Sequence, residues 1–327
     1  MDATQSPERG SSLLWVDSAS IERHLSYGRA ISALREAFCD DAVFVPLRHH
    51  HTIQNPDEPD ATLLLMPAFR PSGFMGVKVV SVYPGNRDKG LVAVQGVYLL
   101  FDAKTGAPLS LFDGTELTRR RTAAASVLAA EALARKDSRK LLLVGAGAIA
   151  RHLASAYAER FELDEIRVWS RSIARARTMA EELACKGWSA EATLDLEGAV
   201  RAADIVSTAT LAREPLIFGD WLSPGTHLDL VGGFTPEMRE ADDAAVQKAR
   251  VYVDTFDGAL KEAGDLVKPL MSGVLSIAAV RGDLSGLCRG TAPARQSREE
   301  ITLFKSVGTA LEDLAVAAEV YRRVRAA

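Results

Sequence analysis

The fold class of this chain follows from ten residues, Leu141-Leu142-Leu143-Val144-Gly145-Ala146-Gly147-Ala148-Ile149-Ala150. The first four predict a buried strand and the residues after the glycines predict a helix, so a G-x-G-x-x-A motif joins strand to helix. The first glycine allows a tight turn, the second lets backbone N–H groups approach a pyrophosphate, and the alanine allows close packing. The alternative is a glycine turn that binds nothing. The residues predicted to bind the dinucleotide at the helix N-terminus are Gly145, Gly147, Ala148 and Ile149.

The kind of dinucleotide is indicated by the residues that follow the next expected strand. About twenty residues past the motif, enzymes that use NAD place an Asp or Glu for the ribose 2′-hydroxyl. This chain instead has Trp169-Ser170-Arg171-Ser172. Because Arg171 and the hydroxyls of Ser170 and Ser172 suit a 2′-phosphate, we predict NADPH as the cofactor, with NADH possible. The alternative is that Arg171 is a solvated residue at a helix start.

Strand and helix patterns alternate from residue 140 to residue 254, which is typical of βαβ units and a parallel sheet. The preceding apolar runs predict a strand-rich segment with a hairpin turn over residues 102–106. The C-terminal region combines a loose segment at residues 286–297 with an amphipathic pattern. The expected strands are residues 42–46, 61–66, 74–82, 91–101, 108–112, 141–144, 165–169, 205–207, 226–231 and 251–253. The expected helices include residues 20–38, 117–134 and 299–325.

The composition is that of a globular chain with two domains. It has 327 residues, 39 Lys and Arg against 43 Asp and Glu, and 47% hydrophobic residues. The mild net charge of −4, without blocks of Lys and Arg, argues against nucleic acid as a partner. No apolar run reaches the roughly 18 residues of a membrane helix, and residues 1–12 are polar, so we expect no membrane partner and a cytoplasmic location.

The cysteines and histidines give no sign of a metal site. Cys39, Cys185 and Cys288 show no CxxC spacing, and we interpret them as buried small hydrophobes. His49-His50-His51 would place only two rings on one face of a strand, with no further ligand cluster nearby in sequence. We therefore predict no metal. A pocket-lining histidine and a solvated strand end remain open interpretations.

Several short segments, each occurring once, follow one another in order along nearly the whole chain. They are Val77-Lys78-Val79-Val80, Arg121-Thr122-Ala123-Ala124, Gly145-Ala146-Gly147, Gly225-Thr226-His227 with Val231-Gly232, Glu262-Ala263-Gly264-Asp265, and Thr302-Leu303-Phe304-Lys305-Ser306-Val307-Gly308. As an ordered set they resemble the ornithine cyclodeaminase/mu-crystallin family. The resemblance implies an α/β fold in which a doubly wound Rossmann domain, residues 122–299, is inserted in an α+β domain. That second domain, residues 1–121 plus 300–327, would bind substrate and dimerise, which implies a homodimer with its active site between the domains.

Three basic residues match family positions that face the substrate: Arg48, Lys78 and Arg121. Two arginines suit a carboxylate, because a guanidinium binds it with two parallel hydrogen bonds. Lys78 is also conspicuous without the resemblance, since a lysine inside an apolar strand needs a partner. The alternatives are an ion-paired or outward-facing Lys78, and Arg119 or Arg120 as the inward residue in place of Arg121.

The resemblance also separates the activities within the family. Cyclodeaminases carry an acid/base Asp after Val-Gly-Gly and a Lys four residues later, whereas this chain has Phe234 and Met238 there. A phenyl ring cannot transfer protons, although Asp229 or Glu237 could substitute from another direction. We therefore predict a reductase of a cyclic imino acid such as Δ1-pyrroline-2-carboxylate or Δ1-piperideine-2-carboxylate, with Lys78 protonating the imine. The residues expected beside the nicotinamide are Thr208, Ala209, Thr210, Val231 and Gly232, and Ser306-Val307-Gly308 is expected to return to the site.

Three other activities remain open. They are ornithine cyclodeamination, amino acid dehydrogenation as in the alanine dehydrogenases of the family, and non-enzymatic binding as in mu-crystallin.

Overall fold

The computed structural model describes residues 13–327, except for the side chains of residues 87 and 88. The polar stretch at residues 1–12, which contributed to the expected cytoplasmic location, lies outside the described residues. The chain divides into two units. Of the described residues, the first contains 13–25, 42–117 and 313–327, and the second contains 26–41 and 118–312. The division expected from the sequence differs in residues 26–41, 118–121 and 300–312, which it assigned to the first unit.

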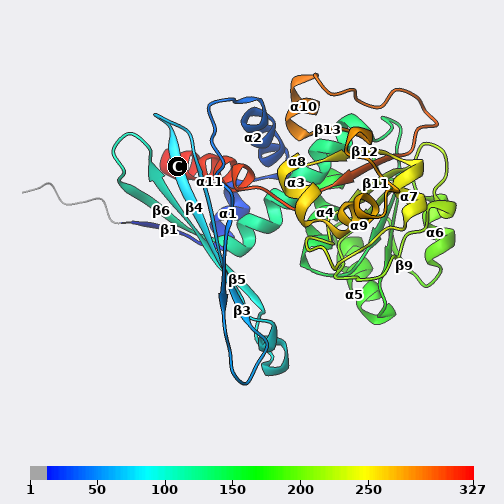
Figure 1. The fold of residues 1–327 in the computed structure, drawn as a ribbon, viewed down its shortest axis with the longest axis horizontal. Coiled ribbons are helices and arrows are strands. Elements are labelled where there is room, and N and C mark those ends of the chain that lie inside the picture. The colour runs from blue at the N-terminus through cyan, green and yellow to red at the C-terminus, as the bar shows by residue number, and fades with distance from the viewer. Residues whose placement is uncertain (1–12) are drawn as a thin grey trace, which may run out of the picture. The chain divides into compact units, whose positions relative to one another are not determined.

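The second unit is built on an eight-stranded sheet in which every pairing is parallel (Figure 1). The strand order is β13-β12-β14-β11-β10-β7-β8-β9, so the direction of winding reverses between β7 and β10. This reversal is the point at which doubly wound folds bind ligands. The predicted fold class is confirmed. The strands are β7 (Lys140–Val144), β8 (Glu165–Trp169), β9 (Ala190–Thr193), β10 (Ile205–Thr208), β11 (His227–Leu230), β12 (Arg250–Val253), β13 (Val280–Asp283) and β14 (Thr302–Lys305).

Helices surround this sheet, and the apolar core lies between them and the strands. Strand residues such as Leu142, Val206 and Leu303 are fully buried there, because both faces of the sheet are covered. The helices are α2 (Tyr27–Cys39), α3 (Gly114–Leu133), α4 (Ala148–Arg160), α5 (Ile173–Cys185), α6 (Leu196–Ala202), α7 (Asp243–Lys248), α8 (Phe256–Glu262), α9 (Gly264–Met271) and α10 (Leu284–Arg289), with 3-10 turns η2 (Gly219–Trp221) and η3 (Ile277–Ala279).

The first unit is a six-stranded sheet in the order β1-β6-β5-β4-β3-β2, with helices α1 (Ser18–His24) and α11 (Ala310–Ala326). Its pairings are antiparallel except β1 with β6. The predicted turn after β5 is present, with Gly106 at φ +74°. The strands are β1 (Leu14–Val16), β2 (His49–Ile53), β3 (Ala61–Phe69), β4 (Phe74–Val82), β5 (Val94–Asp102) and β6 (Pro108–Asp113), and η1 (Pro84–Lys89) precedes β5.

The two faces of this sheet differ in burial. One cross-strand row is buried from end to end: Val16, Phe112, Tyr98, Lys78 and Met66. The next row is offset by one residue, so it points to the opposite face, and its members are only partly covered: Trp15, Leu111, Leu99, Val77 and Pro67. Within this unit, α11 contacts the first face, where Tyr321 packs edge-on against Phe74.

Several local predictions were wrong. The predicted helix at residues 20–38 is two helices, because Leu25 ends α1 and the Ser26 hydroxyl caps α2 at Arg29 N–H. Residues 42–46 form only one bridge, between Phe44 and Phe69. The predicted helix at residues 299–325 contains β14, which lies between β11 and β12 in the sheet, and α11 begins only at Ala310.

The cysteines were also misjudged. Cys39 and Cys185 are exposed, and Cys288 is partly buried. Burial raises the pKa of the Cys288 thiol to about 11. Within residues 13–327, no helix combines the length and the apolar character needed to cross a membrane.

Candidate functional site

The glycine turn after β7 has the form that the motif predicts. Gly145 has φ +117°, and a Cβ there would lie 2.7 Å from the carbonyl oxygen of Ala209. Its N–H donates to the carbonyl of Trp169 at 2.8 Å. Glycine is required at this position because the turn lies directly against the ends of the neighbouring strands, β10 and β8.

The helix N-terminus that follows is open. Gly147 is the N-cap of α4 and provides no side-chain cap, and a Cβ built there would meet no atom within 4 Å. The first-turn N–H groups of a helix have no partner inside the helix, and they carry its positive dipole end. Ala150 is buried, as close packing of α4 requires. Gly147 with Ala148 and Ile149 therefore fits a pyrophosphate.

The loop after β8 holds the residues predicted to read the ribose phosphate. Ser172 caps α5 and accepts a hydrogen bond from Arg175 N–H, while the Ser170 hydroxyl accepts from Ser172 N–H, both at 3.4 Å. Arg171 is exposed between them. This loop contains no carboxylate, and β8 pairs directly with β7, so both loops leave the same edge of the sheet.

The threonines at the end of β10 and in the loop after it have their hydroxyls turned inward. The hydroxyls of Thr208 and Thr210 each donate to Glu240 at 2.7 Å, and Thr210 N–H donates to it at the same distance. Val231 N–H bonds the carbonyl of Thr208. The backbone of these loops, rather than the threonine hydroxyls, is left to face a ligand.

Three charged side chains lie beneath these loops: Glu240, Asp265 and Lys305, each with 0% exposure. Sequence reasoning assigned them no role. One signal was present in the sequence, since Lys305 directly follows the apolar residues Leu303 and Phe304. Burial raises the pKa of Glu240 to about 7; the charge of Lys305 counteracts this effect and that of Asp265 adds to it.

The raised pKa predicts that the free energy of unfolding falls as the pH rises. Between about pH 4.5 and 7 the folded chain keeps a proton on Glu240 that the unfolded chain releases. Glu240→Gln removes this titrating carboxyl group and keeps an oxygen that accepts from Thr210. Urea unfolding across this range measures the effect, and the variant should gain stability over the unmodified protein as the pH rises. Unfolding curves whose difference is constant with pH contradict this assignment.

In the first unit, Lys78 lies in the middle of the buried sheet row. It is 3% exposed, and its Nζ lies 2.7 Å from Oδ2 of Asp313 on α11. Its cross-strand neighbour Tyr98 is fully buried, and the Tyr98 hydroxyl has no hydrogen-bond partner. The Tyr98 ring and hydroxyl lie over Gly76, and a Cβ at Gly76 would collide with them. Burial and the charge of Asp313 raise the pKa of Tyr98 well above its usual value.

In the second unit, Arg121 on α3 is buried and donates to Glu312 at 2.7 Å. Its guanidinium lies against Gly308, which has φ +81° and no room for a Cβ. Asp254 accepts the N–H groups of Val307 and Gly308 at 2.7 and 2.6 Å, which holds this loop in place.

The sequence left open whether Arg119 or Arg120, rather than Arg121, is the inward residue. Arg120 is also buried, and its guanidinium stacks over the ring of Tyr27 at 5.2 Å. Glu312 and Asp313, which hold Arg121 and Lys78, are consecutive residues of α11.

Arg48 and the histidines occupy the edge of the first sheet. Arg48 is half-buried just before β2, and the residues of β2 are exposed. The rings of His49 and His51 meet edge-to-face at 6.2 Å on one side of the strand. Across the described residues, no group of three or more His, Cys, Asp or Glu is placed to hold a metal ion.

The two carboxylates weighed as substitutes for the missing Asp differ in their surroundings. Phe234 is 46% exposed. Asp229 is buried and accepts hydrogen bonds from Ser126, Ser207 and Tyr157, and burial raises its pKa to about 6. Glu237 is exposed, and a hydrogen bond from the Thr235 side chain lowers its pKa.

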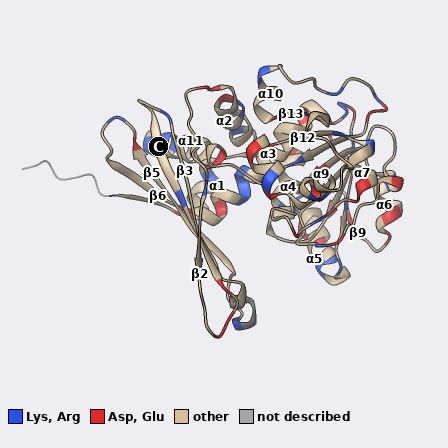
Figure 2. Ribbon diagram, viewed as in Figure 1, with Lys and Arg blue, Asp and Glu red and all other residues tan. Residues whose placement is uncertain are grey.

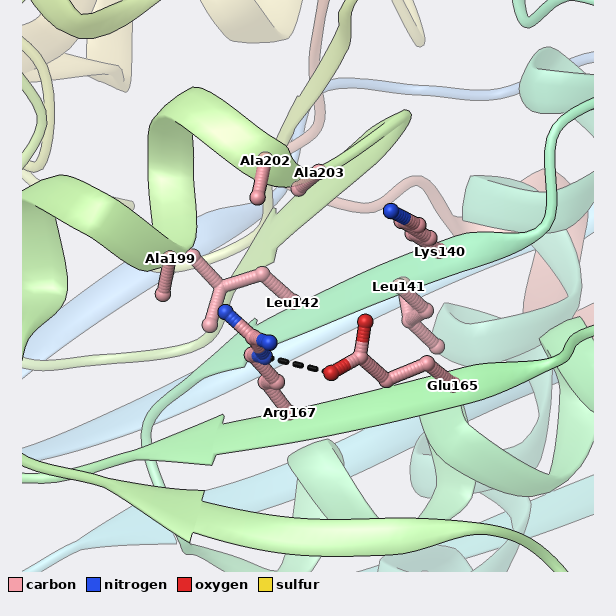
Figure 3. Close-up of a pocket in the computed structure, with 8 residues that line it drawn as sticks. All are labelled: Lys140, Leu141, Leu142, Glu165, Arg167, Ala199, Ala202 and Ala203. Atoms are coloured by element: carbon pink, nitrogen blue, oxygen red, sulfur yellow. Dashed lines mark hydrogen bonds and ion pairs between the residues drawn. The ribbon is translucent and has the colours of Figure 1, made fainter.

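A small cavity of about 10 Å³ lies away from these loops, at the amino ends of β7 and β8 (Figure 3). It is lined in part by Lys140 and Arg167, and Arg167 bonds Glu165 at 2.6 Å. It holds at most about one water molecule. Over the second unit as a whole, basic and acidic residues are interspersed along the helices (Figure 2).

Comparison with known proteins gives a consistent result. The model of the ornithine cyclodeaminase/mu-crystallin family matches residues 15–327. The chain is 40% identical over 312 residues to Δ1-pyrroline-2-carboxylate reductase of Paracoccus denitrificans, covering 93% of this chain and 98% of that protein.

Two solved structures are similar over nearly the whole length. Thermococcus litoralis Δ1-pyrroline-2-carboxylate reductase, in complex with NADH and L-proline, superposes with TM-score 0.90 and 35% identity, covering 96% of this chain and 98% of that one. An archaeal alanine dehydrogenase dimer with bound NAD gives TM-score 0.88 and 30% identity, with 96% of each chain covered.

Proposed function

Because this chain belongs to the ornithine cyclodeaminase/mu-crystallin family and is an NAD(P)H-dependent oxidoreductase, we propose that it reduces a cyclic ketimine carboxylate with NADPH. The proposed substrates are Δ1-pyrroline-2-carboxylate and Δ1-piperideine-2-carboxylate, and the products are L-proline and L-pipecolate. The observation that carries this proposal is the buried Lys78 ammonium. Its Nζ lies 2.7 Å from Asp313, in the buried cross-strand row of the first sheet.

The proposed mechanism assigns each basic residue one task. The dinucleotide, bound through the open N-terminus of α4, supplies a hydride. Lys78 donates a proton to the imine nitrogen, so that the C=N carbon becomes a better electrophile and the product nitrogen is a neutral amine. Arg48 and Arg121 bind the substrate carboxylate. Arg121 also donates from Nη1 to Glu312 at 2.7 Å, and its planar guanidinium matches the geometry of a carboxylate.

The alternatives within the family differ in how far the observations support them. Cyclodeamination needs a carboxylate for proton transfer during loss of ammonia, and Phe234 stands at its position while Asp229 is enclosed by three hydroxyls. Dehydrogenation of a linear amino acid is supported by the alanine dehydrogenase neighbour. It is the second candidate function.

The deciding experiment follows NADPH oxidation with each of the two cyclic ketimines. Pyruvate plus ammonia serves as the test of alanine dehydrogenase activity, and ornithine plus NAD as the test of cyclodeamination. Turnover of a cyclic ketimine supports the proposal. Ammonia release from ornithine, faster turnover of pyruvate, or binding of NADPH without any turnover contradicts it.

The preference for NADPH is proposed from Arg171, which is exposed in a loop without a carboxylate. Arg171→Ala should raise the Michaelis constant for NADPH about tenfold and leave that for NADH unchanged, because one charge-assisted contact to the 2′-phosphate is lost. Arg201→Ala, an exposed arginine on α6, is the matched control. An unmodified enzyme that clearly prefers NADH would show that this proposal is wrong.

We also propose that the protein is a homodimer formed through the partly covered face of the first sheet. The row Trp15, Leu111, Leu99, Val77 and Pro67 is apolar, and such a contiguous face is typical of an interface. Leu99→Lys places a charge in its middle and should convert dimer to monomer, as measured by sedimentation velocity. Thr105→Lys in the hairpin turn is the control, and an unchanged mass for Leu99→Lys rejects this interface.

A further inference from the structure

Three buried charged side chains of the second unit, Lys305, Asp265 and Glu240, lie together near the carboxyl ends of β10, β11 and β14. Lys305 is the last residue of β14, and its Nζ donates to the carbonyl oxygen of Gly232 and lies 3.2 Å from Oδ2 of Asp265. Asp265, in the first turn of α9, accepts the N–H groups of Glu240 and Ala241 at 2.7 and 3.0 Å. Glu240 in turn holds both threonines of the loop after β10.

These side chains pack directly against the backbone of the two loops. A Cβ at Gly232 would collide with the carbonyl of Thr210 and lie 2.5 Å from Oε1 of Glu240. A Cβ at Gly233, which has φ +59°, would lie 2.5 Å from Oδ2 of Asp265. The backbone of each loop therefore lies directly against a buried carboxylate. Lys305 pairs with Asp265, and Asp265 in turn accepts the backbone N–H of Glu240.

The position of the network matches one end of a dinucleotide. The loop after β8, with Arg171, lies on one side of the glycine turn, and the loops after β10 and β11 lie on the other. A dinucleotide that crosses the reversal point with its adenosine half near β8 places its nicotinamide half near β10 and β11. Gly145 contacts Ala209, so the loop that Glu240 holds borders the glycine turn itself.

Stability alone does not account for a buried charge cluster here. A buried ion pair contributes little net stability compared with apolar residues of similar volume, because desolvation offsets the attraction. An ammonium that donates to a loop carbonyl instead fixes the position of that loop, because a hydrogen bond acts only over a short distance. The role of the cluster is therefore to hold the loop in a defined position.

We propose that Lys305, Asp265 and Glu240 are positioning residues that shape the binding site for the nicotinamide half of the cofactor. Lys305 acts through the Gly232 carbonyl and Glu240 acts through Thr208 and Thr210. This inference rests on the cofactor part of the proposed function and is independent of the identity of the substrate.

The test compares two ligands by titration calorimetry: NADPH, and 2′-phospho-ADP-ribose, which has the adenosine half but no nicotinamide. Lys305→Met should weaken NADPH binding about tenfold and leave 2′-phospho-ADP-ribose binding unchanged. Lys248→Met is the matched control, because Lys248 also bonds a glycine carbonyl, that of Gly219, and pairs with an aspartate, Asp220. It should bind both ligands like the unmodified protein.

Equal weakening of both ligands by Lys305→Met, or weakening of neither, overturns the proposal. Should Lys305→Met fail to fold, Asp265→Asn gives the same comparison, since its Oδ1 still accepts from Glu240 while the countercharge of Lys305 is lost. If the unmodified protein binds NADPH but reduces no ketimine, the proposed substrate is wrong and this inference stands. If it binds neither NADPH nor NADH, both fail.

Discussion

Lys78→Met lowers kcat for the reduction of Δ1-pyrroline-2-carboxylate by about 10²–10⁴-fold, the usual contribution of a positioned proton donor. Methionine keeps the length and apolar stem of the lysine but has no proton to give. The dissociation constant for NADPH should not change, because Lys78 belongs to β4 and the dinucleotide residues belong to the second unit. Steady-state kinetics and calorimetry measure the two quantities.

A loss of activity after this substitution has a second possible cause, the removal of the cation that faces Asp313 in the interior. Breaking a buried pair by removing one partner destabilises a protein by about 3–5 kcal/mol. The double variant Lys78→Met/Asp313→Asn removes both charges, so it should recover stability to urea but not activity. Recovery of turnover in the double variant, or wild-type turnover in Lys78→Met, would show that Lys78 is not the proton donor.

The same added methyl group should affect different properties at the two glycines of the dinucleotide motif: NADPH affinity at Gly147 and stability at Gly145. Gly147→Ala should fold with a stability change within about 1 kcal/mol, since a Cβ there meets no protein atom within 4 Å. It should weaken NADPH binding by about 10–100-fold, because the methyl group occupies the space in front of the helix N-terminus.

Gly145→Ala should instead destabilise the fold by about 1–3 kcal/mol, because its φ of +117° is strained for any residue with a side chain and Ala209 is too close. Thermal unfolding without ligand and calorimetry with NADPH separate the two effects. An unchanged NADPH affinity in Gly147→Ala would mean that the pyrophosphate does not bind at this helix.

The elements that could be predicted from the sequence are those whose signal is local. The residues expected for β4 and β8 coincide with the observed strands, because an apolar run between turn residues defines a strand without reference to the rest of the chain. The last strand, β14, was not predicted. Its apolar residues also fit one face of a helix, and only pairing with β11 and β12 selects the extended form.

The candidate site divides in the same way. The glycine motif and the loop at Ser170, Arg171 and Ser172 are each continuous in sequence, so their chemistry could be inferred from the residues themselves. The buried lysines and Arg121 were visible as cations, but their partners were not. Asp313, Glu312 and Asp265 are ordinary acidic residues in sequence.

The amino-acid sequence therefore determined the Rossmann sheet, the dinucleotide motif and the cations of the candidate site, since each depends on periodicity or on a few adjacent residues. Only the tertiary structure decided which carboxylates hold Lys78, Arg121 and Lys305, which face of the first sheet is only partly covered, and that β14 brings Lys305 beneath Gly232. Those features depend on contacts between segments distant along the chain, and folding selects them because a buried charge is stable only beside a partner.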